Sequence, residues 1–200
     1  MNSNVSAVGK TLRNIPLVIT GPSGVGKGTL IDSLLNNHPD RFRLSVSHTT
    51  RNIRQGEIDG EHYHFVDKSK FKEMIDNNEF LEHAQFAGNH YGTSRKEFDS
   101  AKDTCVIFDI EFQGILHFEN VKSEYLKIMI ECLDESILRN RLLNRGSETA
   151  ESLAVRLDTA KKGREALKDI KFDLIIDTSN CSKDDVAKKF YEWAEIAKII

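Results

Sequence analysis

Residues 15–29 read Ile-Pro-Leu-Val-Ile-Thr-Gly-Pro-Ser-Gly-Val-Gly-Lys-Gly-Thr, and this stretch decides the fold of the chain. The apolar run over residues 15–20 ends at a glycine-rich turn, which is typical of a buried parallel strand. Beyond the turn, leucines at helical spacing predict a helix over residues 28–36. The stretch therefore predicts a strand, a glycine-rich loop and a helix in direct succession.

The loop itself predicts a phosphate-binding site. Its glycines let successive backbone N–H groups turn inward, and the N-terminus of the helix adds partial positive charge. Lys27 is placed to reach the β- and γ-phosphate oxygens of a nucleoside triphosphate. A chance strand–turn–helix corner is the alternative, but the strand before the loop and the helix after it disfavour that interpretation. The predicted nucleotide-binding residues are Gly21, Pro22, Ser23, Gly24, Val25, Gly26, Lys27, Gly28 and Thr29.

One loop position departs from the general pattern and affects metal binding. Gly28 stands where a Ser or Thr hydroxyl ordinarily ligates Mg²⁺. Thr29 supplies the next hydroxyl and is predicted to orient the phosphates and help position Mg²⁺, although it could serve only as a helix cap. Asp109 closes the apolar run 104–110, where an acidic residue often helps to hold Mg²⁺, or simply forms a turn. Thr29 and Asp109 are therefore the candidate metal ligands, with Mg²⁺ carried by the nucleotide.

Composition limits the class of protein. The chain has 200 residues, of which 39% are hydrophobic and 30% charged, as in an ordinary globular α/β unit with a small insertion. The net charge of −3 provides no general attraction for nucleic acid. Three cysteines without CxxC spacing disfavour a disulfide framework or zinc site. No apolar leader or membrane-spanning run is seen, so we expect a cytoplasmic protein without membrane association.

The rest of the chain alternates between strand and helix patterns. Strands are predicted over 42–47, 80–86, 104–110, 126–133 and 172–176, and helices near 71–75 and over 134–145, 148–168 and 182–200. The short helix near 71–75 begins at Asp67 or Ser69 as its cap. The residues expected on the packing face of the last helix are Val186, Phe190, Trp193, Ile196 and Ile199.

This order predicts an α/β fold of the P-loop NTPase type, a parallel sheet flanked by helices. A small mixed α+β insertion completes the prediction. We place a flexible tail in 1–14, the core in 15–46 and 94–200 and the insertion in 47–93, and the resemblance described next implies a helical lid at about 139–157.

The segment from Leu44 to Phe65, LSVSHTTRNIRQGEIDGEHYHF, is too specific for a generic loop. It strongly resembles the guanylate kinase signature S-V-S-x-T-T-R-x-x-R-x-G-E-x-x-G-x-x-Y-x-F. The resemblance continues through residues 77–93, Asp109, the Gln113-Gly114 pair and residues 141–156, and with the P-loop it spans roughly residues 15–180. It implies an enzyme that transfers the γ-phosphoryl group of ATP to GMP. The implied partners are ATP and GMP as substrates, and the insertion becomes the GMP-binding part.

The resemblance also implies roles on the acceptor side. The planar guanidinium group of arginine and the hydroxyl group of tyrosine can both donate hydrogen bonds to the GMP phosphate. A carboxylate accepts from the adjacent N1–H and N2–H₂ donors of guanine, whereas adenine presents a bare acceptor there. The implied phosphate contacts are Arg51, Arg54, Tyr63 and Tyr91, and the implied guanine contacts are Ser47, Glu82 and Thr93. Glu57, Asp109 and Glu111 complete the implied GMP-binding set.

On the donor side, the resemblance matches the lid arginines to Arg141, Arg145 and Arg156. The first two are four residues apart and share one helix face, which from spacing alone could be only a solvated basic surface. With Lys27 and Arg51 they form the implied catalytic set. No catalytic base is assigned, because the second pKa of a phosphate is about 6. Asp177 replaces an asparagine associated with the adenine pocket and is assigned to ATP binding.

Two other functions remain open at this point. A guanylate-kinase-like module that binds protein partners would have the same fold, although such modules typically have a degraded P-loop. A kinase for another monophosphate is the second possibility. Glu82 disfavours AMP, whereas dGMP is not excluded because no reader of the 2′-hydroxyl is assigned. Both a monomer and a homodimer fit the sequence.

Overall fold

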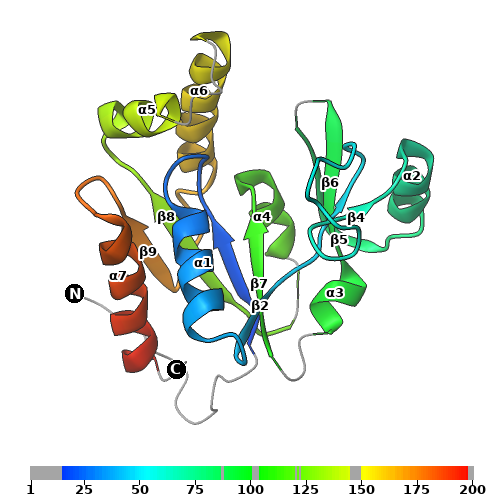
Figure 1. The fold of residues 1–200 in the computed structure, drawn as a ribbon, viewed down its shortest axis with the longest axis horizontal. Coiled ribbons are helices and arrows are strands. Elements are labelled where there is room, and N and C mark those ends of the chain that lie inside the picture. Colours follow the sequence, from blue (N-terminus) through cyan, green and yellow to red (C-terminus); the bar gives the residue numbers. More distant parts are fainter. Residues whose placement is uncertain are drawn as a thin grey trace.

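In the computed structural model, the core is a five-stranded parallel sheet of order β2-β7-β1-β8-β9 (Figure 1). The structure describes residues 15–86, 88–100, 104–119, 121, 123–144 and 150–197. The strands of this core sheet are β1 (Leu17–Thr20), β2 (Phe42–Leu44), β7 (Cys105–Ile110), β8 (Leu126–Glu131) and β9 (Leu174–Asp177). Because β1 is central, the loop that follows it emerges in the middle of the carboxyl edge of the sheet.

Helices cover both faces of the core sheet, as alternation along β1 requires. Leu17 and Ile19 pack in one apolar cluster with α1 (Lys27–Asn37) and α7 (Lys183–Ile196). Val18 belongs to a second cluster on the opposite face, with α3 (Arg95–Asp99) and α4 (Phe112–Phe118). Both faces of a parallel strand are thus buried, which explains the unbroken apolar run in the sequence. Two further helices, α5 (Glu135–Leu143) and α6 (Ala150–Ala166), pack against each other beyond the carboxyl edge (Figure 1).

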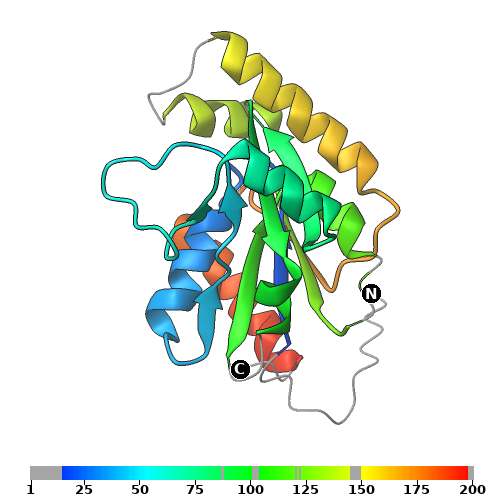
Figure 2. The ribbon, with the colours of Figure 1, turned by 90° about the vertical axis from the view of Figure 1, so that its right-hand side faces the viewer.

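A second, mixed sheet of order β4-β3-β6-β5 lies on the other side of the P-loop from α5 and α6 (Figure 1). Its strands are β3 (His48–Thr49), β4 (His64–Phe65), β5 (Phe80–Phe86) and β6 (Asn89–Ser94). Strands β3 and β4 pair in parallel, while β6 is antiparallel to both β3 and β5. Helix α2 (Lys68–Asp76) is capped by Asp67, and its Phe71 stacks on Phe80 of the sheet. Figure 2 shows the loop around residues 51–61 (cyan) projecting away from the core sheet.

The predicted parallel sheet flanked by helices is confirmed, and the differences are local. The strand predicted over 42–47 ends at Leu44, because the chain then leaves the core sheet and Val46 N–H donates to the Glu97 carboxylate. Helices α3 and α4 are short and were not predicted. The prediction that Ile196 packs inward is wrong, since its side chain is 74% exposed. Ile199 and the tail 1–14 lie outside the described residues.

Histidines line one face of the second sheet. The register places His48 opposite Gly92, and Gly92 opposite His83, so all three share that face. The ring centroid of His48 lies 4.6 Å from that of His64 and 5.5 Å from that of Phe80. Its Nδ1 is buried and has no hydrogen-bond partner among the described residues. Burial, and next the neighbouring His64, lower the pKa of His48 to about 4.

His48 should therefore make folding pH-dependent. Its pKa is below the ordinary histidine value of 6.5, so the unfolded chain binds the extra proton and stability is lost as pH falls from 6.5 towards about 4. His48→Leu should flatten this decline. Thermal unfolding of the unaltered chain and the variant at about pH 7 and about pH 5 measures this effect. Between the two pH values, Tm should fall less in the variant than in the unaltered chain. An equal loss in both proteins would contradict this role for His48.

Candidate active site

At two positions of the loop between β1 and α1, glycine is required both by the backbone angle and by the lack of space for a Cβ. Gly21 has φ +149°, and a Cβ there would lie 2.0 Å from the backbone oxygen of Ile130 in β8. Gly24 has φ +89°, and a Cβ there would lie 2.9 Å from Cδ2 of Leu142 in α5. These φ values are in the region where side chains are strained, and the space is already filled. The loop is therefore held between the core sheet and α5.

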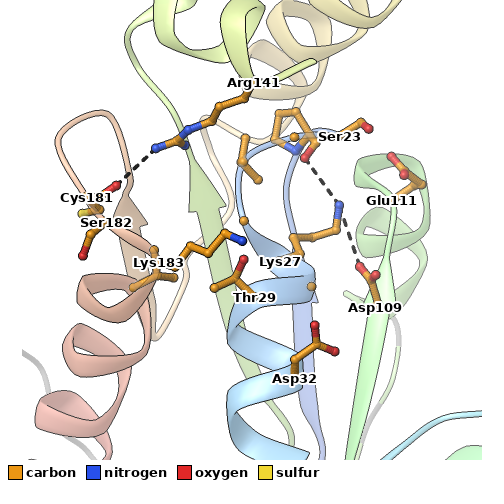
Figure 3. Close-up of a pocket in the computed structure, with 16 residues that line it drawn as sticks. Ser23, Lys27, Thr29, Asp32, Asp109, Glu111, Arg141, Cys181, Ser182 and Lys183 are labelled. Atoms are coloured by element: carbon orange, nitrogen blue, oxygen red, sulfur yellow. Dashed lines mark hydrogen bonds and ion pairs between the residues drawn. The ribbon is translucent and has the colours of Figure 1, made fainter. Parts of the chain in front are cut away.

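Lys27, the first residue of α1, folds over this loop (Figure 3). Its Nζ donates a 2.6 Å hydrogen bond to the backbone oxygen of Gly21 and lies 3.8 Å from Oδ1 of Asp109. The lysine side chain is only 11% exposed, whereas that of Asp109 is 44% exposed. A nearly buried ammonium thus stands at the helix N-terminus, where the backbone already favours anions.

A cavity of about 770 Å³, called here the P-loop cavity, opens above the loop. Residues 22–29 form its floor. Asp109 and Glu111 lie on one side, and the opposite side is made by Arg141 of α5 and by residues 181–183 and Val186 (Figure 3). This opposite side, except for Arg141, was not predicted from the sequence, because residues 181–186 carry no motif and reach the loop only through the packing of α7 against α1.

The guanidinium of Arg141 is anchored to the turn after β9. It donates to Oγ1 of Thr178 at 2.9 Å, to the backbone oxygen of Thr178 at 2.8 Å and to that of Cys181 at 3.4 Å. Arg156 of α6 donates to Oγ of Ser23 at 2.9 Å, which brings a second predicted lid arginine to the loop. Arg145 lies outside the described residues. Arg156 thus connects α6 to the phosphate-binding loop, and Arg141 connects α5 to the turn after β9.

A second cavity of about 270 Å³, called here the Glu82 cavity, adjoins the first. Asp109 and Glu111 line both cavities, so the two meet at these carboxylates. Of the predicted acceptor-side residues, those lining the Glu82 cavity are Ser47, Tyr63, Glu82, Tyr91, Asp109 and Glu111. Arg51, Arg54, Glu57 and Thr93 are not among its lining residues.

Glu82 is a buried carboxylate, 8% exposed, on β5. Its Oε1 accepts a 2.6 Å hydrogen bond from the hydroxyl of Thr93 on β6. Burial raises the pKa of Glu82, while hydrogen bonds from Thr93 act in the opposite direction. A Cβ on Gly114 of α4 would lie 2.7 Å from Oε2, so the glycine in the Gln113-Gly114 pair leaves the room that the carboxylate occupies. Such a buried carboxylate is expensive unless a ligand or partner supplies donors.

Arg51 is paired within its own loop. Its guanidinium forms a two-pronged pair with Glu57, with distances of 2.9 Å and 2.7 Å, and lies 5.4 Å from the ring centroid of Tyr63. Glu57 also accepts a 2.7 Å hydrogen bond from the backbone N–H of Arg54. Hydrogen bonds from Arg51 and from the Arg54 backbone lower the pKa of Glu57 to about 2. Glu57 therefore orients Arg51 beside Tyr63, at the edge of the Glu82 cavity.

Asp177, assigned to ATP binding from the sequence, is not among the residues that line the P-loop cavity. Its Oδ1 accepts hydrogen bonds from the backbone N–H and hydroxyl of Ser179, at 3.0 Å and 2.6 Å, and from the backbone N–H of Leu133. Burial tends to raise the pKa of Asp177, but the hydrogen bonds from Ser179 outweigh it, so the pKa is lowered. In this structure the side chain shapes the turn that carries the cavity wall.

The strand, the loop and the helix that begins at Lys27 form the phosphate-binding arrangement of P-loop nucleotide-binding proteins, which defines the class of this protein. Comparison with known proteins identifies its family. The guanylate kinase family model matches residues 13–194. A guanylate kinase of Clostridium perfringens is 42% identical over 160 residues, covering 79% of this chain and 74% of the relative.

Two further relatives agree. A guanylate kinase of Sus scrofa is 39% identical over 171 residues, covering 84% of this chain and 86% of the relative. The crystal structure of guanylate kinase from Anaplasma phagocytophilum matches with a TM-score of 0.69 at 28% identity, covering 96% of this chain and 89% of that one. This chain therefore belongs to the guanylate kinase family, ATP:GMP phosphotransferases that phosphorylate GMP with ATP to give GDP. Within the described residues, no helix is long and apolar enough to cross a membrane.

The two glycine environments predict opposite effects of alanine. Gly21→Ala should lower the Tm by about 3–10 °C, because the methyl group meets backbone and must assume a strained φ. Gly28→Ala should raise the Tm by about 1–3 °C, because alanine favours the helix. Nothing lies within 4 Å of a Cβ at position 28. Thermal unfolding of the two variants and of the unaltered chain measures both changes in Tm. A normal Tm in Gly21→Ala would show that the loop is not held against β8 as described.

Proposed function

We propose that this chain transfers the γ-phosphoryl group of ATP to GMP and dGMP, giving ADP and the corresponding diphosphate. The observation that carries the proposal is the meeting of two unlike cavities at Asp109 and Glu111. One holds a P-loop and the other holds the buried carboxylate of Glu82. A donor and an acceptor phosphate placed in adjoining cavities meet the main requirement of phosphoryl transfer, which is positioning.

In the donor half, Lys27 and the backbone N–H groups of the loop hold the β- and γ-phosphates. Arg141, Arg145 and Arg156 neutralise the charge that develops on the transferred group. The nucleotide lies in the P-loop cavity against residues 181–183 and Val186. Asp177 supports this site through the turn it shapes, because its carboxylate is already engaged by Ser179.

In the acceptor half, Glu82 accepts hydrogen bonds from N1–H and N2–H₂ of guanine, with Ser47 and Thr93 beside it. Adenine would leave the buried carboxylate facing a lone pair, and that cost excludes AMP. Tyr63, Tyr91, Arg51 and Arg54 bind the acceptor phosphate, with Glu57 orienting the guanidinium of Arg51. We include dGMP as an acceptor because no reader of the 2′-hydroxyl is assigned.

Mg²⁺ is the expected cofactor, carried with ATP. Mg²⁺ is bound in many nucleotide sites by one or two carboxylates, phosphate oxygens and water. Asp109 and Glu111 supply carboxylates to the P-loop cavity, and Thr29 supplies a hydroxyl, so the donor set fits. These residues would hold the ion, directly or through water, and it would neutralise phosphate charge. No protein base is needed, because the acceptor phosphate has a second pKa of about 6.

The arrangement of the elements around the P-loop supports a site that closes over its two nucleotides. The described parts of the proposed GMP-binding insertion (47–86 and 88–93) and of the proposed lid (139–144 and 150–157) flank the P-loop (Figure 1). Their approach would exclude water from the phosphates. We further propose a cytoplasmic enzyme that works without nucleic acid or membrane, as a monomer or homodimer. The support for the compartment is that its three cysteines are free.

Release of ADP in the presence of single nucleoside monophosphates tests this function. GMP and dGMP should support turnover, whereas AMP, CMP and UMP should support little. Lys27→Ala should reduce kcat by about 10²–10³-fold, as expected on removing one preorganised charge, while GMP still raises the Tm. Absence of turnover with every monophosphate, together with retained GMP binding, would instead favour a guanylate-kinase-like binding module.

Base choice should depend on the Glu82 carboxylate. Glu82→Gln keeps the shape but replaces one acceptor oxygen with a donor, so one guanine hydrogen bond is lost and another group is left unpaired. We expect kcat/KM for GMP to fall about 10–100-fold and the preference for GMP over AMP to narrow. Gln85→Glu on the same strand is an exposed control and should leave both values unchanged. An unaltered GMP/AMP ratio in Glu82→Gln would show that another group reads guanine.

A further inference from the structure

Lys183 is a cation of the P-loop cavity that no motif identifies. It is the first residue of α7 and lines the cavity. Figure 3 shows its side chain extending towards Thr29, across the N-terminal end of α1. The ion pairs recorded among the described residues do not include Lys183, in contrast to Lys27, which pairs with Asp109. Its charge is therefore available to an anion in the cavity.

The two lysines stand at different ends of the P-loop cavity. Lys27 lies beside Asp109, where the Glu82 cavity begins. Lys183 lies on the opposite side, with Cys181 and Ser182 (Figure 3). Phosphoryl transfer requires the reacting atoms to be about 3–3.5 Å apart and in line, so the γ-phosphate must lie at the Lys27 end. The nucleoside end of the donor then lies towards α7.

Two local features leave room for a phosphate between Lys183 and the loop. Gly28 lines the cavity, and nothing lies within 4 Å of where its Cβ would stand. Lys183 begins α7, whose first turn also carries Asp184 and Asp185, so the attraction for a phosphate here comes from the lysine and from the N-terminus of α1. The first turn of α1 carries no acidic residue. Of the three phosphates of ATP, the one nearest the nucleoside matches this position.

We propose that Lys183 binds the α-phosphate of the donor nucleotide, an inference that rests on the proposed role of the P-loop cavity as the ATP site. Lys183 thus contributes to donor affinity and not to the chemical step, because it is remote from the transferred group. This divides the cations that contact the donor into Lys27 at the γ-phosphate and Lys183 at the α-phosphate. The α-phosphate is shared by ATP, ADP and AMP.

The test is to measure, by calorimetry, the binding of ADP, ATP and adenosine to the unaltered chain and to Lys183→Met. The dissociation constants for ADP and ATP should rise by a similar factor, about 3–10-fold, as expected for one solvent-accessible charged contact. Adenosine binding should not change. In turnover, KM for ATP should rise by the same factor, with kcat within about two-fold and KM for GMP unaltered. Lys183→Arg should retain most of the ADP affinity, because it keeps the charge.

Lys188→Met is the matched control. Lys188 lies on the same helix, is 73% exposed, pairs weakly with Glu192 and does not line the P-loop cavity, so its loss should leave ADP binding unchanged. The unliganded Tm of both variants should equal that of the unaltered chain. Unchanged ADP and ATP affinity in Lys183→Met overturns the inference, and so does a fall in kcat with normal KM. Failure of the unaltered chain to phosphorylate GMP would contradict the proposed function alone, since ADP binding still tests Lys183.

Discussion

The structure depends on the close contact between the P-loop and the strand beside it. Gly21 packs directly against the backbone of Ile130, at a distance where no side chain fits. This contact fixes the direction in which the chain leaves the core sheet and therefore where α1 begins. Lys27 then donates to the oxygen of Gly21, so the functional cation is oriented by the same residue that makes the turn. A single backbone constraint thus positions both the loop and its lysine.

The same constraint links the loop to more distant elements. Gly24 packs against Leu142 of α5, and Arg141, the preceding residue of α5, reaches across to the turn after β9. Thr178 in that turn also donates to the backbone oxygen of Val25 in the loop. The loop, α5 and the β9 turn therefore form one connected network. Movement of the proposed lid would involve these contacts directly, which provides a physical route from closure to the phosphate site.

Much of this could be predicted from the sequence because its signals are local. The apolar run before Gly21 and the glycines after it specify a strand, a loop and a helix within 15 neighbouring residues. The acceptor segment was identified by resemblance, and Ser47, Tyr63, Glu82 and Tyr91 do line one cavity. Features that depend on tertiary packing could not be predicted from the sequence. Lys183 and Val186 reach the P-loop cavity only because α7 lies against α1, and Ile196 is exposed although its spacing suggested burial.

Asp177 is assigned to ATP binding from the sequence. Its carboxylate accepts three hydrogen bonds, from the backbone N–H groups of Leu133 and Ser179 and from the Ser179 hydroxyl. An asparagine oxygen could accept the same bonds, so the shape of the turn does not depend on the charge.

The two cavities use charge in different ways. Around the P-loop cavity, Asp109 and Lys183 are substantially exposed, so their interactions are screened by water until a ligand or closure removes it. Glu82 is already desolvated, and burial has raised its pKa before any ligand arrives. A base that supplies two donors would favour the ionised carboxylate and lower that pKa again. In the proposed function, binding of guanine therefore stabilises the charged form of Glu82, whereas a base without those donors provides no such stabilisation. In the proposed function, discrimination between bases follows from the desolvation of Glu82 on folding, whereas donor affinity comes from contacts that stay hydrated until the proposed closure.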